Sequence, residues 1–254
     1  MNIVVPINFV PDLVEEFSIA DSGKDLDREW VSLMLNEFDD HAIEQAILLK
    51  ERTDAEVTVM APDVEGVDDA LATASARGAD RLIKLEDDFE AGASKHALAR
   101  AYAAAIPALQ PDLVLTGVQA HDDLDGTVGP LLAEYLGMPY VGYISGVEIG
   151  DGAALVRKEY PGGLIAEMEV MLPAVLGIQA ADQPPRYVAF SKIRQAMQSA
   201  EITELEAEIP EDAGAAAVVR MYLPETGERA EMIEGDEEEV ASRLVELFEQ
   251  AGIL

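Results

Sequence analysis

Apolar and polar positions follow two alternating periods along residues 1–136. Short apolar runs such as IVVPI and VTVMA fit buried strands, and the segments between them repeat apolar residues every three or four positions, as amphipathic helices do. The pattern predicts strands at residues 3–7, 57–61, 81–85 and 112–117, and helices at residues 39–52, 64–77, 94–106 and 129–136. Strands and helices in strict alternation predict βαβ units and a parallel sheet.

Residues 141–178 show a different pattern. Three runs in this region have strand character: VGYISGVEI (141–149), AALVRKEY (153–160) and AEMEVMLPAVLGI (166–178). They are separated by the turn sequences Gly150-Asp151-Gly152 and Pro161-Gly162-Gly163, so we expect antiparallel hairpins here. The predicted fold class is therefore α/β, a Rossmann-like, mostly parallel twisted sheet with added antiparallel strands, followed by an extended C-terminal arm that ends in a helix.

The C-terminal arm contains one strong helix signal. Beyond residue 183 strand signals are few, and residues 213–217 have the low complexity of a linker. Residues 237–250 follow an acidic block and predict a one-sided helix, with apolar side chains at Val240, Leu244, Leu247 and Phe248. We expect this apolar face to pack on another surface.

Composition narrows the possible functions. The chain has 254 residues, 49% of them apolar, which suffices for one large α/β domain with an extension. It has no cysteine, which excludes disulfides, thiolate zinc sites and a cysteine nucleophile, and its three scattered histidines argue against a histidine-rich metal site. No apolar run is long enough to span a membrane, and the N-terminus lacks signal-peptide features, so we expect a cytoplasmic protein without membrane insertion.

The chain is strongly acidic, with a formal net charge of −33. Such a field repels nucleic acid and anionic membranes, so we expect no nucleic-acid partner. Two causes remain open: a docking surface for a basic partner, or the general surface acidity of proteins in a salty cytoplasm. The acidic residues are spread from Asp12 to Glu249, which favours the second.

The segment TGVQAHDDLDGTVGP, residues 116–130, leads from a predicted strand into a predicted helix. In parallel sheets ligands collect at the carboxyl ends of strands, and a helix N-terminus offers backbone N–H groups to phosphate. Gly126 and Gly129 permit close backbone approach, Thr127 offers a hydroxyl, and the aspartates suit ribose hydroxyls. An ordinary loop with helix-capping carboxylates explains the same residues, and neither common phosphate-binding fingerprint is present.

Two further segments have alternative interpretations. LNEFDDHAIEQAILLKE begins a helix for which Asn36 and Asp39 are candidate caps. PPRYVAFSKIRQAMQ presents Tyr187, Phe190, Ile193 and Met197 either as core or as a partly exposed docking element. No catalytic triad, carboxylate pair or metal-ligand cluster emerges from the sequence. The residues alone indicate a nucleotide-binding α/β domain with an arm.

Six segments, taken in order, resemble the beta subunit of electron-transfer flavoproteins, including relatives associated with nitrogen fixation and electron bifurcation. They are IVVPINFVPD, LNEFDDHAIEQAILLKE, ATASARGADRLIKL, PDLVLTGVQAHDDLDGTVGPLLAEYLGMP, VRKEYPGGLIAEMEVMLPAVLGI and PPRYVAFSKI. The resemblance runs from Ile3 to about Met197. It implies a heterodimer with an alpha subunit that carries electrons from flavin dehydrogenases to a quinone oxidoreductase or similar acceptor and makes no bonds itself.

The resemblance also implies the cofactors. FAD lies mainly on the alpha subunit and touches beta at their junction, while beta holds AMP in ordinary carriers, or a second FAD with NADH binding in bifurcating members. The implied nucleotide-site residues are Pro6, Ile7, Asn36, Met60, Ala61, Pro62, Asp123, Gly126, Thr127, Val128 and Gly129. Phe38 matches an aromatic position close to the flavin, and Leu13 matches a neighbouring position that can be aromatic. HDD in the loop favours AMP, whereas VGP is similar to bifurcating members.

Partner contacts follow from the same resemblance. PPRYVAFSKI is similar to the family's recognition loop, with Phe190 as the anchor and Tyr187 and Ile193 beside it, although RQAMQSAEI replaces a lysine run that many members have. The C-terminal helix wraps the alpha subunit. The implied division is a nucleotide-binding α/β domain at 1–182, a recognition-loop-like segment at 183–200 and the arm with its helix at 201–254. A universal-stress-type nucleotide-binding protein is the rival from another class.

Overall fold

The computed structural model describes residues 1–87, 89, 93–208, 218–224, 230 and 232–253. These residues form two compact units, Met1–Val219 and Arg220–Leu254. The predicted linker at residues 213–217 lies outside the described residues.

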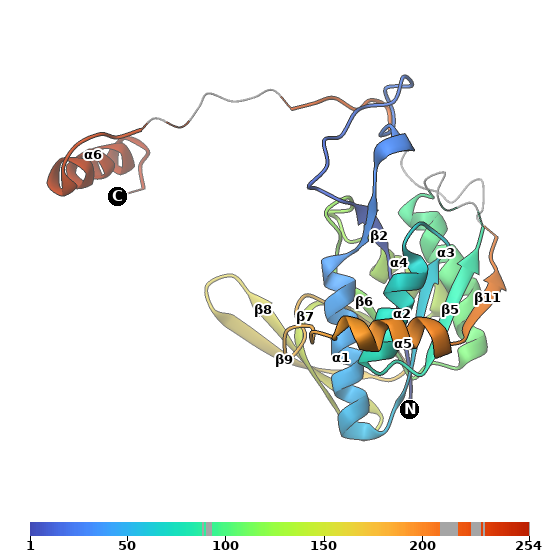
Figure 1. Ribbon diagram of the computed structural model, residues 1–254. Helices are drawn as coiled ribbons and strands as arrows, with labels where there is room; N and C mark the ends of the chain where they lie inside the picture. The colour runs from blue at the N-terminus through green and yellow to red at the C-terminus, as the bar shows by residue number, and fades with distance from the viewer. Residues whose placement is uncertain (88, 90–92, 209–217, 225–229, 231, 254) are drawn as a thin grey trace. The chain divides into compact units, whose positions relative to one another are not determined.

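The first unit is built on a large twisted sheet. Its described strands follow the order β11-β5-β4-β1-β6-β10-β7-β8-β9 (Figure 1). Their bounds are β1 Asn2–Pro6, β4 Glu56–Pro62, β5 Arg81–Glu86, β6 Leu113–Gly117, β7 Tyr140–Ile149, β8 Ala153–Tyr160, β9 Leu164–Met171, β10 Ala174–Ile178 and β11 Ile202–Glu206. Pairing is parallel from β11 across to β7 and antiparallel between β7, β8 and β9. Successive strands leave β1 in one direction and β6 in the other, so the order reverses between them.

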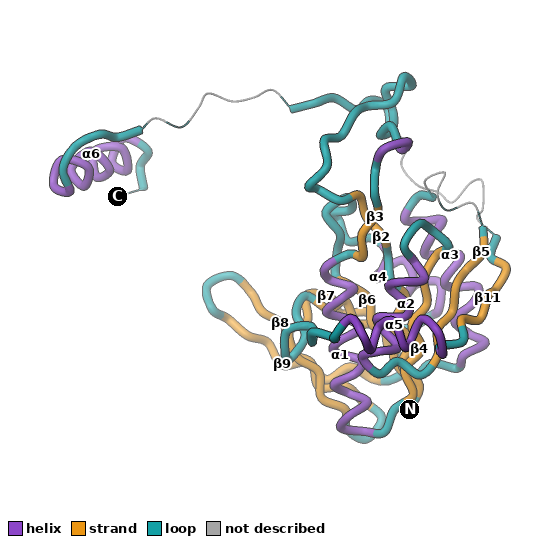
Figure 2. The backbone as a smooth tube through the Cα atoms, viewed as in Figure 1, coloured by secondary structure: helices purple, strands orange, loops and turns teal. Residues whose placement is uncertain are grey.

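Helices cover both faces of this sheet (Figure 2). Their bounds are α1 Glu37–Thr53, α2 Val67–Arg77, α3 Lys95–Ala105, α4 Val128–Leu136 and α5 Phe190–Ser199, with short 3-10 helices at Arg28–Trp30 and Ile106–Leu109. A Cβ on Gly117 would meet α1, whereas the hydroxyl of the preceding Thr116 faces α4. Since neighbouring strand residues point to opposite faces, α1 and α4 lie on opposite sides of the sheet.

A smaller antiparallel sheet precedes α1. It joins β2, Phe9–Pro11, to β3, Leu33–Leu35. This pair stands at the carboxyl end of β1 and leads the chain into α1.

The predicted fold class is confirmed, with one strand assigned to the wrong kind of pairing. Residues 174–178 were expected within an antiparallel hairpin, but β10 pairs in parallel with both β6 and β7. All five of its residues are buried, as a central parallel strand covered on both faces requires. The run 166–178 therefore divides into an antiparallel strand, β9, and a central parallel one.

One strand in the C-terminal arm was not predicted from the sequence. β11 pairs in parallel with β5, with Ile202 opposite Leu82. Its sequence ITELE carries two glutamates and lies at the edge of the sheet, so only pairing with β5 identifies it. The first residues after 201 thus belong to the main sheet.

The second unit contains α6, Glu237–Gln250, which has the bounds that the sequence predicts. A capping box closes its N-terminus, because Asp236 accepts from the amides of Glu238 and Glu239 while Glu239 accepts from the amide of Asp236. No residue of α6 is buried within the described chain: Val240 and Leu247 are half-buried, and Leu244 and Phe248 are exposed.

Candidate functional site

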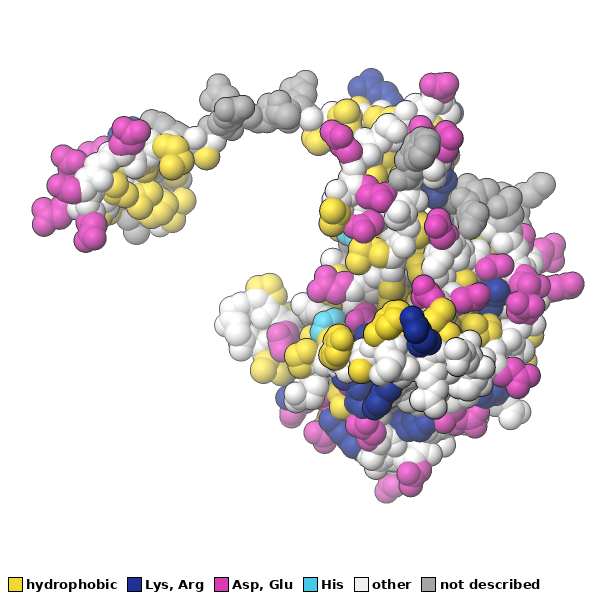
Figure 3. All heavy atoms as spheres, in the orientation of Figure 1, with side chains coloured by type: hydrophobic (Ala, Val, Ile, Leu, Met, Phe, Trp, Pro, Cys, Tyr) yellow, Lys and Arg dark blue, Asp and Glu magenta, His cyan; other side chains and the backbone are white. Residues whose placement is uncertain are grey.

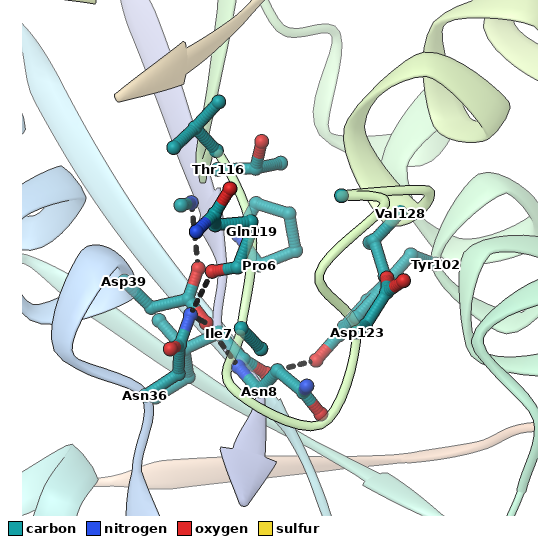
Figure 4. A pocket seen from close by; sticks show the side chains of 14 residues that line it. Pro6, Ile7, Asn8, Asn36, Asp39, Tyr102, Thr116, Gln119, Asp123 and Val128 are labelled. Carbon is teal, nitrogen blue, oxygen red and sulfur yellow. Dashed lines mark hydrogen bonds between the residues drawn. The ribbon is translucent and has the colours of Figure 1, made fainter. Parts of the chain in front are cut away.

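A pocket opens at the carboxyl ends of β1 and β6, where the strand order reverses (Figure 4). Ligands of open α/β sheets bind at this point. About 330 Å³ of empty space, open solvent at its mouth included, lies between the lining side chains. The lining residues are Pro6, Ile7, Asn8, Asn36, Asp39, Tyr102, Thr116, Gly117, Val118, Gln119, Ala120, Asp123, Gly126 and Val128.

One wall of the pocket is the start of α1. Asp39 is 4% exposed, and its carboxylate accepts hydrogen bonds from the amide of Gly117 at 2.6 Å, the amide of Asn8 at 2.9 Å and the side chain of Asn36 at 3.0 Å. Asn36 also donates to the carbonyl of Gln119 at 2.9 Å. Asn36 is the N-cap residue of α1, as expected, but its side chain makes no capping hydrogen bond, and Asp39 lies inside the first turn rather than at the cap. Both side chains instead tie neighbouring strand ends together.

Burial dominates the electrostatics of this wall. It raises the pKa of Asp39 from 3.8 to about 6, although the hydrogen bonds from Gly117, Asn36 and Asn8 and the charge of Lys95 act in the opposite direction. The hydroxyl of Tyr102, on α3, donates to the carbonyl of Ile7 at 2.5 Å. Burial also raises the pKa of Tyr102 well above its usual value, so this group stays a donor.

The opposite wall is the loop between β6 and α4. Asp123 accepts from the amide and the hydroxyl of Thr127, both at 2.9 Å, which fixes the turn into the helix. Gly126 has a φ of +62°, and a Cβ there would lie 2.3 Å from the carbonyl oxygen of Val118. This position therefore requires glycine, both for its dihedral angle and for its close approach to a neighbouring backbone.

The comparisons with known proteins decide the family. Residues 26–210 match the Electron transfer flavoprotein domain. The chain is 34% identical to the electron transfer flavoprotein subunit beta of Methylophilus methylotrophus over 98% of both chains. It is 35% identical to that of Syntrophomonas wolfei over 92% of this chain and 88% of the relative, and 37% identical to that of Clostridium acetobutylicum over 76% and 74%.

The chain belongs to the electron transfer flavoprotein beta-subunit family. The resemblance seen in the sequence is thereby confirmed.

Most of the site residues that the resemblance implied gather at one place. Pro6, Ile7, Asn36, Asp123, Gly126 and Val128 line the pocket, and Thr127 and Gly129 lie beside them in the loop and the first turn of α4. Met60, Ala61 and Pro62 are buried at the end of β4 outside the lining set, where the carbonyl of Met60 accepts from the amide of Ile7 at 2.8 Å. Phe38 is half-buried and Leu13 is exposed, and neither lines the pocket.

Sequence reasoning missed part of the lining. Asn8 follows β1 and Gln119 follows β6, so their positions just after strand ends could have identified them as candidate lining residues. Tyr102 has no such signal, because only the packing of α3 brings its hydroxyl to Ile7.

Most of the apolar side chains singled out in the segment 183–200 are exposed. Tyr187 is 90% and Phe190 66% exposed, Met197 is exposed, and only Ile193 is half-buried, so the core interpretation of this segment is wrong. Figure 3 shows apolar side chains gathered over α5. Arg194 stacks on the ring of Phe190, with its guanidinium carbon 5.2 Å from the ring centre.

An arginine anchors the start of this segment. The side chain of Arg186 donates to Glu44 at 2.7 Å and to Glu51 at 2.6 Å, and its amide donates to Glu44 at 3.1 Å. Glu44 is only 1% exposed, so the pair fixes the segment against α1. Hydrogen bonds to Glu51 and Glu44 raise the pKa of Arg186 further above its usual range.

None of the helices in the described ranges is long and apolar enough to cross a membrane. Within the same ranges, no group of three histidine, aspartate or glutamate side chains is placed to hold a metal ion.

Proposed function

We propose that this chain is the beta subunit of a heterodimeric electron transfer flavoprotein and binds AMP in the pocket between β1 and β6. The complex would accept electrons from flavin dehydrogenases and pass them to a quinone oxidoreductase or similar acceptor. Family membership supports the electron-transfer role and pairing with an alpha subunit. The observation that carries the nucleotide proposal is the pocket at the reversal of strand order, bounded by a glycine loop and a helix N-terminus.

The residues present fit a nucleotide. As the first residues of α4, Val128 and Gly129 have amide groups without acceptors inside the helix, and these suit a phosphate. The hydroxyl oxygen of Thr116, which lines the pocket, is buried and has no hydrogen-bond partner among the residues that the structure describes. A buried hydroxyl of this kind costs free energy until a partner binds it, so it favours a polar ligand.

FAD would lie mainly on the alpha subunit, with Phe38 and the exposed Leu13 of this chain near it. The flavin supplies the redox chemistry, and this chain binds it, excludes water from it and presents it to partners. AMP would act structurally, because a ligand that binds only the folded state stabilises that state.

Two alternatives were open from the sequence. The family match removes the universal-stress alternative. The second alternative, a bifurcating complex in which this pocket holds a second FAD and the beta subunit binds NADH, differs from the carrier in cofactor content. The carrier is favoured by the HDD sequence, His121 to Asp123, in the loop.

The test is a count of cofactors. The chain is coexpressed with its alpha subunit, the complex is purified and denatured, and FAD and AMP are quantified per dimer by chromatography. One FAD and one AMP are expected. Two FAD without AMP would establish the bifurcating alternative, and a complex without any nucleotide bound to this chain would refute the assignment of the pocket.

The partner surfaces are tested separately. We propose that Tyr187, Phe190 and Ile193 dock a dehydrogenase and that Val240, Leu244, Leu247 and Phe248 pack on the alpha subunit. A buried aromatic anchor carries much of the free energy of a small interface. Phe190→Ala should therefore slow reduction by the dehydrogenase at least tenfold with unchanged FAD and AMP content. Gln198→Ala, a change at an exposed position of the same helix outside the proposed docking residues, is the control, and equal rates in both variants would contradict Phe190 as anchor.

A further inference from the structure

One carboxylate joins the two strands between which the pocket opens. Asp39 Oδ1 accepts from the amide of Gly117, the last residue of β6, and Oδ2 accepts from the amide of Asn8, just beyond β1. Gly117 leaves room for this contact, since a Cβ there would lie 2.7 Å from Oδ1. The distance between the two strand ends is therefore bridged through a side chain of α1.

Asp39 is also connected by hydrogen bonds to residues further along the pocket wall. Oδ2 also accepts from the side chain of Asn36, which in turn donates to the carbonyl of Gln119. Figure 4 shows the hydrogen bonds that Asp39 accepts. The carboxylate of Asp39 thus holds four lining residues of the pocket in place. It binds Asn8, Asn36 and Gly117 directly, and it acts on Gln119 through Asn36.

The surroundings of Asp39 contain few other charges. From α3, Tyr102 faces it as a neutral hydroxyl, and Lys95 acts on it only at a distance because its ammonium pairs with Asp122 at 2.9 Å. On α1 the next residue, Asp40, pairs with Arg77 instead. Among the described residues no cation forms an ion pair with Asp39, so hydrogen bonds from Gly117, Asn36 and Asn8 compensate its charge more than Lys95 does.

We infer that Asp39 is the positioning residue of this pocket, whose ionised carboxylate holds the ends of β1 and β6 and Asn36 in the arrangement that binds the nucleotide. The inference rests on the proposed nucleotide function. Protonation turns one acceptor oxygen into a donor that faces N–H groups, so it releases Asn8 or Asn36 and weakens ligand binding. Because burial raises the pKa of Asp39 to about 6, this loss occurs between pH 7 and pH 5.

The test compares Asp39→Asn with Asp40→Asn, a matched change at the next residue of the same helix that pairs away from the pocket. Each full-length chain is purified with its alpha subunit and stripped of nucleotide, and AMP affinity is measured calorimetrically from pH 5.0 to 7.5. Between pH 7.5 and pH 5.0 the AMP affinity of the wild type and of Asp40→Asn should fall about tenfold more than the AMP affinity of Asp39→Asn. A factor of about ten corresponds to the loss of one hydrogen bond. Titration of the AMP phosphate is common to all three proteins and cancels.

A second measurement does not depend on ligand. Amide hydrogen exchange at Asn8 and Gly117, corrected for intrinsic rates, should accelerate at least tenfold in Asp39→Asn, and in the wild type at pH 5. Parallel affinity profiles in all three proteins, or unchanged exchange at both amides, would overturn the positioning role. If the wild type binds no nucleotide, the proposed function fails, and exchange alone decides whether Asp39 holds the strand ends. If Asp39→Asn does not fold, the acceleration of amide exchange at Asn8 and Gly117 in the wild type between pH 7 and pH 5 decides.

Discussion

Replacing Gly126 by alanine tests the proposed role of the loop between β6 and α4 most directly. Gly126 has a φ of +62°, and its missing Cβ would lie 2.3 Å from the carbonyl oxygen of Val118. That oxygen cannot retreat freely, because the amide of Val118 donates to Ile178 of the central strand β10 at 3.0 Å. The loop, rather than the sheet, must therefore move when a methyl group is added.

Gly137 supplies a matched control at the other end of α4. Its φ is +65°, and nothing lies within 4 Å of the position that a Cβ would take. Gly137→Ala thus has the strain of a left-handed alanine alone, about 1 kcal/mol. Gly126→Ala has the same strain plus displacement of the loop, and we expect a total of about 3 kcal/mol. For a chain of this size these losses correspond to Tm shifts of about 3 °C and about 9 °C.

Both variants are examined by thermal unfolding of the nucleotide-free complex and by AMP content after purification. Gly126→Ala should lose most of its AMP, since the loop leaves its place beside α4, while Gly137→Ala should retain it. Equal Tm shifts in the two variants would show that the contact with Val118 does not matter. Full AMP content in a folded Gly126→Ala complex would refute the assignment of this loop to the ligand.

Three further outcomes are expected. Because burial raises the pKa of Asp39 from 3.8 to about 6, the folded chain binds more protons than the unfolded chain between these values, so the free energy of unfolding contributed by this group falls as pH rises from about 4 to about 6. Urea titrations should show this slope in the wild type and lose it in Asp39→Asn. Arg186→Gln should lower the free energy of unfolding by about 2 kcal/mol, because it leaves the buried Glu44 without its cation. Arg243→Gln, which breaks an exposed ion pair, should change the free energy of unfolding by less than about 0.5 kcal/mol. Equal losses in the two variants would contradict a role for burial of Glu44. The net charge of −33 should make Tm rise from low to molar KCl as self-repulsion is screened, and a flat or falling Tm would count against a high-salt origin of the acidity.

The pattern of apolar and polar residues was enough to predict the elements that have a clear strand or helix period. The strands that begin the chain and the helix Glu237–Gln250 were predicted because strand burial and helical amphipathicity leave residue-level signatures. The loop Asp123–Gly129 was recognisable for the same reason, since glycines and capping carboxylates at a strand-to-helix turn are local features. Family membership followed from the order of several such segments.

Tertiary structure alone decided how these pieces meet. The run at residues 174–178 pairs in parallel at the sheet centre, and ITELE becomes a strand only beside β5, because strand pairing joins residues distant in sequence. Asp39 looked like a helix cap in the sequence, yet its carboxylate is bound by amides beyond β1 and at the end of β6. Tyr102 reaches the pocket through helix packing. The sequence by itself determined the fold class and the glycine loop. Which side chains form the pocket was decided by contacts between residues 31 to 95 positions apart in the chain. The physical reason is that hydrogen bonds depend on distance in space and not on distance along the chain.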